Sequence, residues 1–216
     1  MVELRRKLVH TGFLAFAALC VLPISSGSAE PLKLVVFGDS LTAGYQLEEG
    51  GAFPSQLSDA LKERGFDVEV VNASVSGDTT SAGLARLDWS IGEDTDAVIV
   101  ELGANDMLRG IPPARTRENL DAIVARLKER DIPVLVAGMM AQRNLGDQFA
   151  AEFDGIFEDV AGTYDALYYP FFLEGIAFDP KLNLNDGMHP NAEGVSVIVR
   201  NMLPTVEQLL ARAGSS

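Results

Sequence analysis

VVFGDSLTAGY (Val35–Tyr45) joins a run of apolar, strand-favouring residues to a Gly-Asp-Ser turn, which passes directly into small residues that favour a helix. A nearly continuous apolar run before such a turn is typical of a strand buried on both faces of a parallel sheet. The serine at the turn, Ser40, has two interpretations. It caps the following helix, or it is a nucleophile held at the end of a strand.

Other valine-rich apolar runs repeat this pattern along the chain, and amphipathic stretches separate them. Strands that alternate with helices predict an α/β fold, in which helices cover both faces of a parallel sheet. Pro170 favours an edge position or an early end for the last candidate strand. The predicted strands are 32–37, 68–73, 96–102, 132–139 and 166–172.

The helical stretches carry their apolar residues on one face, as in Leu120–Leu127 and in Val195–Leu209 near the C-terminus. Gly65 is expected to end a helix that begins near Phe53. Pro204 is expected to kink the last helix or to divide it in two.

The first 29 residues differ from the rest. Three basic residues at positions 5–7 precede a short apolar run, and small residues ending at Ala29 follow it. This order predicts a secretory signal peptide, residues 1–29, before a single domain over residues 30–216. A membrane anchor is the alternative, but polar residues interrupt the apolar run, which is short for a span. The mature protein is therefore expected to be periplasmic or secreted.

The charge of the chain excludes some classes of partner. The formal net charge of the whole chain is −14, and removal of residues 1–29 leaves 14 basic and 30 acidic side chains, a formal charge of −16. Phosphate backbones and anionic lipid surfaces repel such a polyanion, so a nucleic-acid partner is not expected. Cys20 leaves with the signal peptide, and His189 is then the one remaining histidine. A histidine-rich or Cys/His zinc site is therefore not expected.

Polar, glycine-bearing segments follow the predicted strands and precede the last helix. Ligands in open α/β sheets bind outside the carboxyl ends of the strands, so a site is expected among these segments. The segments are GDS (38–40), NASVSGDTT (72–80), ELGANDMLRG (101–110) and NDGMHPN (185–191).

Three residues in these segments predict a catalytic triad. The Ser40 hydroxyl needs a base to become a nucleophile, and His189 is the one imidazole available. Asp186 lies three residues before His189, so one tight turn brings its carboxylate to Nδ1 of the ring. Pro190 biases His189 towards an extended backbone on a loop. The expected triad is Ser40, His189 and Asp186.

Acyl transfer also needs donors for the developing oxyanion, and three candidates are present. They are the backbone N–H of Ser40, the backbone N–H of Gly77 and the side-chain amide of Asn105. Each has a structural alternative as a cap or turn residue, and Asp39 and Asp106 are interpreted mainly as turn-forming or supporting carboxylates. Independent structural roles at all four segments are improbable together.

The motifs GDSL, SGD, GAND and DGMHP resemble the four sequence blocks of the GDSL-type SGNH hydrolases. GDSLTAGY, VVNASVSGDTTSAGLARL, VELGANDMLRG and LNDGMHPN are most similar to the bacterial exported arylesterase/acyl-CoA thioesterase I/lysophospholipase subfamily, over roughly residues 32–210. The resemblance implies a flavodoxin-like three-layer α/β/α sandwich with a five-stranded parallel sheet of order 2-1-3-4-5. It also implies the same triad and oxyanion hole, with no metal and no cofactor.

The expected activity is hydrolysis of carboxylic esters and thioesters through an acyl-enzyme on Ser40, with small acyl or aryl esters as substrates and a monomer as the default state. Ala104 and Met107 stand where relatives commonly have glycines, and Leu145 stands where they often have tyrosine. The acyl-chain preference is therefore left open. One alternative is a carbohydrate O-acetylesterase of the same superfamily, and another is a non-catalytic anion-binding protein. The expected substrate-binding residues are Leu41, Met107, Leu108, Ile111 and Leu145.

Overall fold

The computed structural model describes residues 30–215, so the predicted signal peptide lies outside the described residues. The described part contains a five-stranded parallel sheet of order β2-β1-β3-β4-β5, which confirms the predicted order. The strands are β1 (Leu32–Gly38), β2 (Val68–Asn72), β3 (Ala97–Glu101), β4 (Val134–Ala137) and β5 (Leu167–Tyr169).

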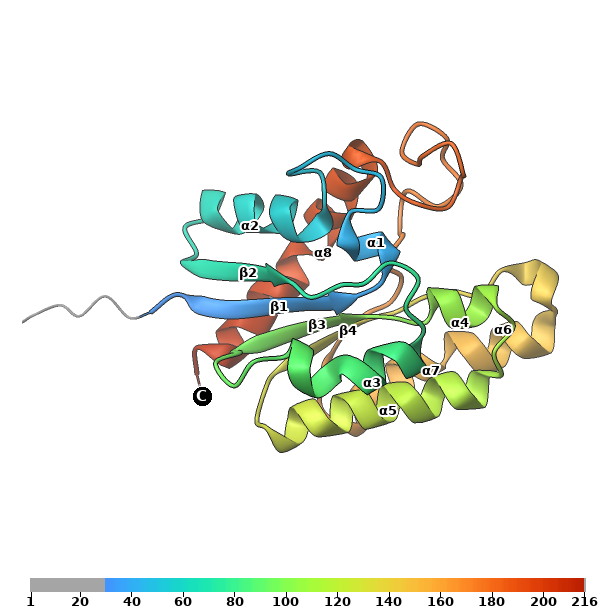
Figure 1. Cartoon of the computed structure of the whole chain (residues 1–216), viewed down its shortest axis with the longest axis horizontal. Coiled ribbons are helices and arrows are strands. Elements are labelled where there is room, and N and C mark those ends of the chain that lie inside the picture. Colours follow the sequence, from blue (N-terminus) through green and yellow to red (C-terminus); the bar gives the residue numbers. More distant parts are fainter. Residues whose placement is uncertain (1–29, 216) are drawn as a thin grey trace, which may run out of the picture. The chain divides into compact units, whose positions relative to one another are not determined.

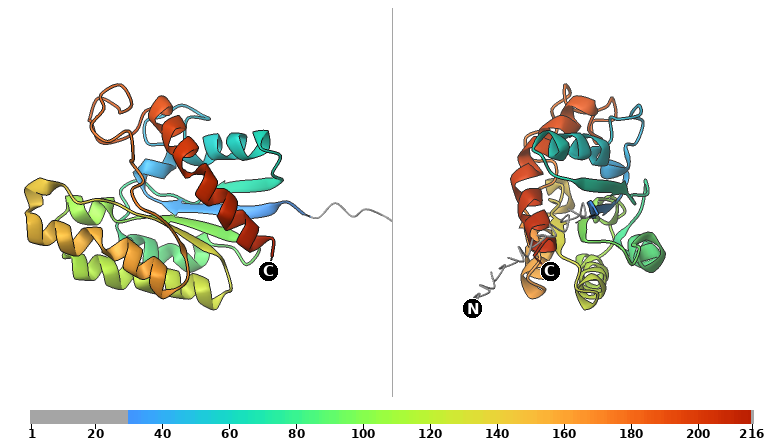
Figure 2. Two further views of the ribbon diagram at one scale, coloured as in Figure 1. Left: turned by 180° about the vertical axis from the view of Figure 1, so that it is seen from behind. Right: turned by 90° about the vertical axis from the view of Figure 1, so that its left-hand side faces the viewer.

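Helices cover both faces of this sheet, as Figures 1 and 2 show. Helices α2 and α8 pack together on one face, and α3, α5 and α7 lie on the other, which gives the predicted three layers. The α-helices are α1 (Ser40–Ala43), α2 (Phe53–Glu63), α3 (Thr80–Ser90), α4 (Ala104–Leu108), α5 (Pro113–Glu129), α6 (Asp147–Asp154), α7 (Ile156–Thr163) and α8 (Ala192–Ala213), and a 3-10 helix, η1, spans Arg143–Leu145.

The central strands form the core, whereas the edge strands are less buried than the apolar pattern suggested. All residues of β3 and β4 are buried. No residue of β2 is fully buried, because β2 has a neighbouring strand on one side only. At the other edge, β5 ends one residue before Pro170, as expected of a residue that cannot donate to a strand ladder.

Two helix boundaries test the predictions from proline and glycine. Helix α2 begins at Phe53, and Gly65 follows its end with a φ of 83°, as predicted. Helix α8 runs unbroken through Pro204, so of the two expected outcomes, a kink or a division, the division does not occur. Pro204 and Arg200, whose carbonyl loses its helical donor, are both exposed, so solvent can satisfy that carbonyl.

Every strand runs in the same direction, so the segments that follow β1, β2 and β3 all leave at one edge of the sheet. Residue pairing brings Gly38, the last residue of β1, opposite Glu101, the last residue of β3. No helix among the described residues is both long and apolar enough to cross a membrane.

Candidate active site

Side chains from two distant segments meet at this edge. The Oγ atom of Ser40 lies 2.9 Å from Nε2 of His189, although 149 residues separate them in the chain. On the other side of the ring, Nδ1 of His189 lies 2.7 Å from Oδ2 of Asp186. The three side chains thus form the hydroxyl–imidazole–carboxylate series in which the imidazole can accept the hydroxyl proton.

Ser40 is positioned by the start of α1. Asp39 caps this helix, since its Oδ1 accepts a hydrogen bond of 3.0 Å from the backbone N–H of Leu41. Gly44 ends the helix one turn later with a φ of 87°, a conformation that costs little without a Cβ. The short helix therefore holds Ser40 at the end of β1 with its hydroxyl towards His189.

His189 is positioned by a closed loop. Asn183 and Pro190 form an isolated bridge, and the backbone N–H of Leu184 donates to the carbonyl of His189 at 2.8 Å. Within this loop, Oδ1 of Asp186 accepts from the backbone N–H groups of Met188 and His189, at 2.9 and 3.1 Å. The backbone hydrogen bond from Met188, with those from His189, lowers the pKa of Asp186 to about 2. Asp186 is therefore a carboxylate at neutral pH.

Asn105 follows β3 and Gly77 follows β2, so both lie in segments at the same edge of the sheet as Ser40. Asn105 is in the first turn of α4, and its Nδ2 donates to Oδ2 of Asp39 at 2.9 Å. Gly77 has a φ of 87°, and its carbonyl accepts from Nη2 of Arg109 at 2.7 Å. A further hydrogen bond of 3.0 Å, from the Val75 N–H to the Gly38 carbonyl, ties the Gly77 loop to the end of β1.

Ser40, Asn105 and His189 line one cavity of about 710 Å³. Leu41, Met107 and Leu108, three of the predicted substrate-binding residues, line it as well. Ile111 and Leu145 do not line it. Ala104 of α4 lines it too. The other apolar side chains around it come from the segments after β4 and β5, and they are Met139, Met140, Ala141, Phe171, Leu173, Ala177, Phe178 and Met188.

Residues 36–197 match the GDSL-like lipase/acylhydrolase family. The chain belongs to this family. It is 41% identical over 171 residues to an arylesterase of Vibrio mimicus, covering 79% of this chain and 86% of the relative. It is 33% identical over 198 residues to thioesterase 1/protease 1/lysophospholipase L1 of Escherichia coli (strain K12), covering 91% and 93%.

A solved structure of TesA has the same fold, with a TM-score of 0.78 and 34% identity over 82% of this chain and 99% of that one. Family and relatives together identify the chain as an ester-hydrolysing enzyme of the α/β class.

Sequence reasoning missed some residues that surround the site of this GDSL-family hydrolase. The ring of Tyr45 lies against that of His189, with centroids 4.5 Å apart. Glu101 is buried beneath Asp39. The signal for Glu101 was present, because it is the one acidic residue in the otherwise apolar strand β3.

Arg86 was also missed, although it connects two of the segments that form the site, 38–40 and 72–80. This buried side chain donates from Nε to Oδ2 of Asp78 at 2.5 Å, from Nη1 to the Ala73 carbonyl at 2.6 Å and from Nη2 to the Gly38 carbonyl at 3.1 Å. Its guanidinium lies 4.1 Å from the centroid of the Phe37 ring. An arginine on a helix offers no sequence signal that separates such a role from a solvated one.

Asp106 has the supporting role that the sequence suggested. It is fully buried and accepts hydrogen bonds from the Thr80 N–H and hydroxyl at 2.8 and 2.5 Å. The Thr116 hydroxyl donates to it at 3.3 Å. Asp106 therefore ties α4, which carries Asn105, to the start of α3 and to α5.

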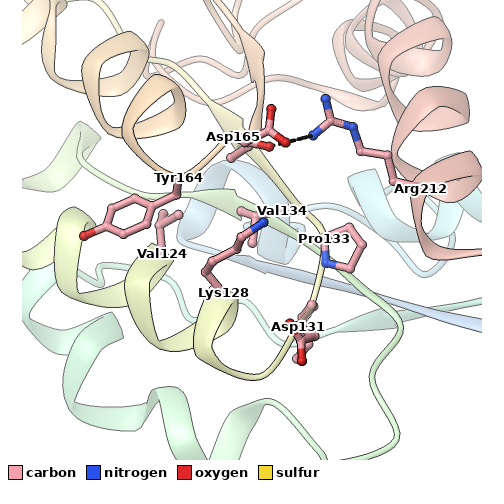
Figure 3. Close-up of a pocket in the computed structure, with 10 residues that line it drawn as sticks. Val124, Lys128, Asp131, Pro133, Val134, Tyr164, Asp165 and Arg212 are labelled. Carbon is pink, nitrogen blue, oxygen red and sulfur yellow. Dashed lines mark hydrogen bonds and ion pairs between the residues drawn. The ribbon is translucent and has the colours of Figure 1, made fainter. Parts of the chain in front are cut away.

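A second cavity of about 720 Å³ opens near the start of β4, away from Ser40 (Figure 3). An ion pair between Asp165 and Arg212 closes one side of it, with a separation of 3.9 Å. Its lining contains no serine, cysteine or histidine, so it offers no nucleophile–base pair of the kind described above.

Proposed function

We propose that this GDSL-family hydrolase is a serine esterase that cleaves carboxylic esters and thioesters through an acyl-enzyme on Ser40. The observation that carries the proposal is the 2.9 Å separation of Ser40 Oγ and His189 Nε2 at the wall of an apolar cavity. A serine with only a structural role at the start of α1 would need no imidazole at that distance.

In the first step, Nε2 of His189 takes the proton of the Ser40 hydroxyl as the Ser40 oxygen bonds to the carbonyl carbon of the substrate. Asp186 holds the ring with its proton on Nδ1 and stabilises the imidazolium that forms. The imidazolium then protonates the leaving alcohol or thiol. In the second step, His189 removes a proton from water, and the water oxygen displaces Ser40 to release the acid.

The oxyanion formed in each step requires donors that are in place before the reaction. We assign this role to the backbone N–H of Ser40, the backbone N–H of Gly77 and the side-chain amide of Asn105. The connections of Asn105 to Asp39 and of the Gly77 loop to the end of β1 support this assignment.

The substrate class follows from the cavity. Its wall beyond Ser40 is made largely of methionine, leucine, phenylalanine and alanine side chains, which suit an aryl group or an acyl chain. Relatives named arylesterase and thioesterase/lysophospholipase support aryl esters, acyl thioesters and lysophospholipids as candidates. A carbohydrate O-acetylesterase would need polar groups to bind a sugar. Beyond the proposed catalytic groups the wall has four polar side chains, Gln142, Arg143, Asn144 and Asn183, and apolar side chains outnumber them.

We also propose that residues 1–29 are a signal peptide, that the mature domain starts at Glu30, and that the enzyme acts in the periplasm or outside the cell. The basic residues before an apolar run support export. A monomer is the simplest state for a site whose proposed residues all come from one chain.

The test is hydrolysis of p-nitrophenyl esters and acyl thioesters of increasing chain length by the wild type and by Ser40→Ala. We expect the wild type to cleave both classes, and kcat to fall about 10³-fold or more in Ser40→Ala, because the nucleophile is lost. Mass spectrometry of quenched reactions should detect an acyl adduct on Ser40 in the wild type.

The matched control is Ser76→Ala, an exposed serine in the loop before Gly77, which should retain wild-type rates. Equal activity of wild type and Ser40→Ala would reject Ser40 as the nucleophile. Cleavage confined to acetylated sugars would favour the O-acetylesterase alternative.

A further inference from the structure

Two carboxyl groups lie buried together directly behind Ser40. Asp39 is 0% exposed and Glu101 is 1% exposed, and the backbone N–H of Asp39 donates to Oε2 of Glu101 at 3.4 Å. Gly38 makes this approach possible, because a Cβ at that position would lie 2.8 Å from the Glu101 carbonyl oxygen and 2.9 Å from its Oε2. A hydrogen bond between two carboxyl groups requires a proton on one of them.

The neighbouring donors indicate which group carries the charge. Both oxygens of Asp39 accept hydrogen bonds of ordinary length, 3.0 Å from the Leu41 N–H and 2.9 Å from Asn105 Nδ2. The contacts to Oε2 of Glu101 are longer, 3.4 Å from the Asp39 N–H and 3.3 Å from the Thr42 hydroxyl. Hydrogen bonds to an ionised carboxylate are the shorter and stronger ones, so the negative charge belongs on Asp39.

The charged groups around Asp39 and Glu101 also favour a negative charge on Asp39. A positive charge on His189 lowers the pKa of Asp39 and so favours its ionised form. The Arg86 guanidinium approaches the same region through the Gly38 carbonyl. Burial raises the pKa of Glu101 well above its ordinary value, and the neighbouring Asp39 charge raises it further. Burial also raises the pKa of Asp39, but only to about 6, so Asp39 is the group that is ionised at neutral pH.

We propose that Glu101 is a neutral carboxylic acid that donates its proton to the Asp39 carboxylate, and that Asp39 thereby orients the Asn105 amide towards the substrate oxyanion. Asp39 and Glu101 are positioning residues, since neither lines the cavity. This inference rests on the proposed function, in which Asn105 is an oxyanion donor.

Asp39 can orient Asn105 because a side-chain amide has a donor group, NH₂, and an acceptor group, C=O. The Asn105 NH₂ group has two hydrogens, and one is used on Asp39 Oδ2. The other is then available to the substrate. Without an acceptor on Asp39, the amide can rotate and present its carbonyl oxygen, which would repel the oxyanion. Loss of an oxyanion-hole donor typically lowers kcat about 10²–10³-fold.

The first test is the pair Asp39→Asn and Asn105→Ala with the double variant, in the mature enzyme. Asn at position 39 keeps an oxygen to cap α1, but its NH₂ cannot accept from Asn105. We expect Asp39→Asn to lower kcat about 10–100-fold with KM changed less than about threefold, because the substitution misorients Asn105, whose hydrogen bond to the oxyanion forms only in the transition state. The double variant should be no slower than Asn105→Ala alone.

Multiplicative effects of the two substitutions, or an unaltered kcat in Asp39→Asn, would overturn the role of Asp39. A purely structural role would lower the fraction of folded enzyme and leave the effects independent of Asn105. If Ser40→Ala is fully active, the proposed function itself fails. If Ser40→Ala and Asn105→Ala are impaired but Asp39→Asn is not, only this inference fails.

The second test concerns the proton on Glu101. Glu101→Leu removes the donor to Asp39, whereas Glu101→Gln replaces it with an amide N–H of similar size. We expect kcat to fall in Glu101→Leu and to be restored to within about threefold of wild type by Glu101→Gln, since a neutral donor is all that the site requires. Infrared difference spectra at pH 8 should contain a carboxylic-acid C=O band that disappears in Glu101→Gln. Absence of this band in the wild type, or equal loss of activity in both variants, would show that Glu101 is ionised.

Discussion

Asp186 holds His189 by contacts that lie within a single turn of the chain. Its Oδ2 faces Nδ1 of the ring, and its Oδ1 accepts from two backbone N–H groups of the same turn. The carboxylate is therefore oriented by local backbone and not by distant elements. This is why a separation of three residues, from Asp186 to His189, was enough to predict the pair.

Substitution of Asp186 by Asn should separate orientation from folding. The Asn oxygen can still accept from the Met188 N–H, but its NH₂ group donates to Nδ1 and favours the tautomer with the proton on Nε2, which cannot act as a base. We expect kcat to fall about 10³–10⁴-fold. The measurement is steady-state hydrolysis of a p-nitrophenyl ester at pH 7. A variant within tenfold of wild type would contradict the assigned role.

The pH dependence of the stability difference between wild type and Asp186→Asn tests whether Asp186 is ionised in the folded protein. The pKa of Asp186 is depressed to about 2, so its contribution to stability is present above the unfolded value near 4 and is lost as pH falls through about 2. Wild type and Asp186→Asn should therefore differ more in urea midpoint at pH 7 than at pH 2.

At the scale of elements, Arg86 connects helix α3 to the ends of β1 and β2. Its planar group reaches the Asp78 carboxylate and two backbone carbonyls at once. Lysine cannot reproduce this fork, and the substitution leaves Asp78 and the carbonyls of Gly38 and Ala73 short of donors. Alanine would remove the charge as well and leave the buried Asp78 carboxylate unpaired, so we expect Arg86→Ala to lower the free energy of unfolding by about 3–5 kcal/mol, measured by urea denaturation.

The matched control for this prediction is Arg126→Ala. Arg126 also pairs with an aspartate, Asp88, at 3.2 Å, but both side chains are largely exposed. An exposed pair contributes about 0–1 kcal/mol. Equal losses in the two variants would mean that the Arg86 contacts contribute little beyond those of a surface ion pair.

The segment after β5 carries Phe178 at the wall of the cavity. This side chain is 81% exposed, and its backbone has a φ of 63°, a strained conformation for a bulky residue. Burial of part of the ring against a long acyl chain would compensate for that exposure. We expect Phe178→Ala to reduce kcat/KM for decanoyl esters about fivefold and to leave butyryl esters nearly unchanged.

Trp89 on α3 is the control for Phe178, since it is 78% exposed and does not line the cavity. Trp89→Ala should have the same chain-length profile as the wild type. If Phe178→Ala had that profile too, Phe178 would have no part in binding the acyl chain.

At the scale of the whole molecule, the dominant feature is the negative charge, 30 acidic against 14 basic side chains after residue 29. The resulting potential repels anionic substrates until salt screens it. We expect kcat/KM for an anionic acyl-CoA thioester to rise about two- to tenfold between 10 mM and 200 mM salt. The rate for an uncharged p-nitrophenyl ester should change little over the same range, and a parallel rise for both would contradict the argument.

The amino-acid sequence was enough to predict the strands and, through the family resemblance, their order. It also predicted the residues of the proposed site. Buried parallel strands require continuous apolar runs, and capped turns require particular residues. Both can therefore be predicted from short stretches of sequence. Ser40, Asn105 and His189 were found because hydroxyl, amide and imidazole groups stand out in polar segments after such runs.

Only the tertiary structure decided how Glu101, Arg86 and Tyr45 surround these groups. Their contacts join residues that are far apart in the chain, as Gly38 and Glu101 are joined by the pairing of β1 with β3. The protonation of a buried carboxyl group, and the freedom of the Asn105 amide, depend on which neighbours that pairing brings within hydrogen-bonding distance. Such distances cannot be predicted from local sequence, because the packing of the whole sheet sets them.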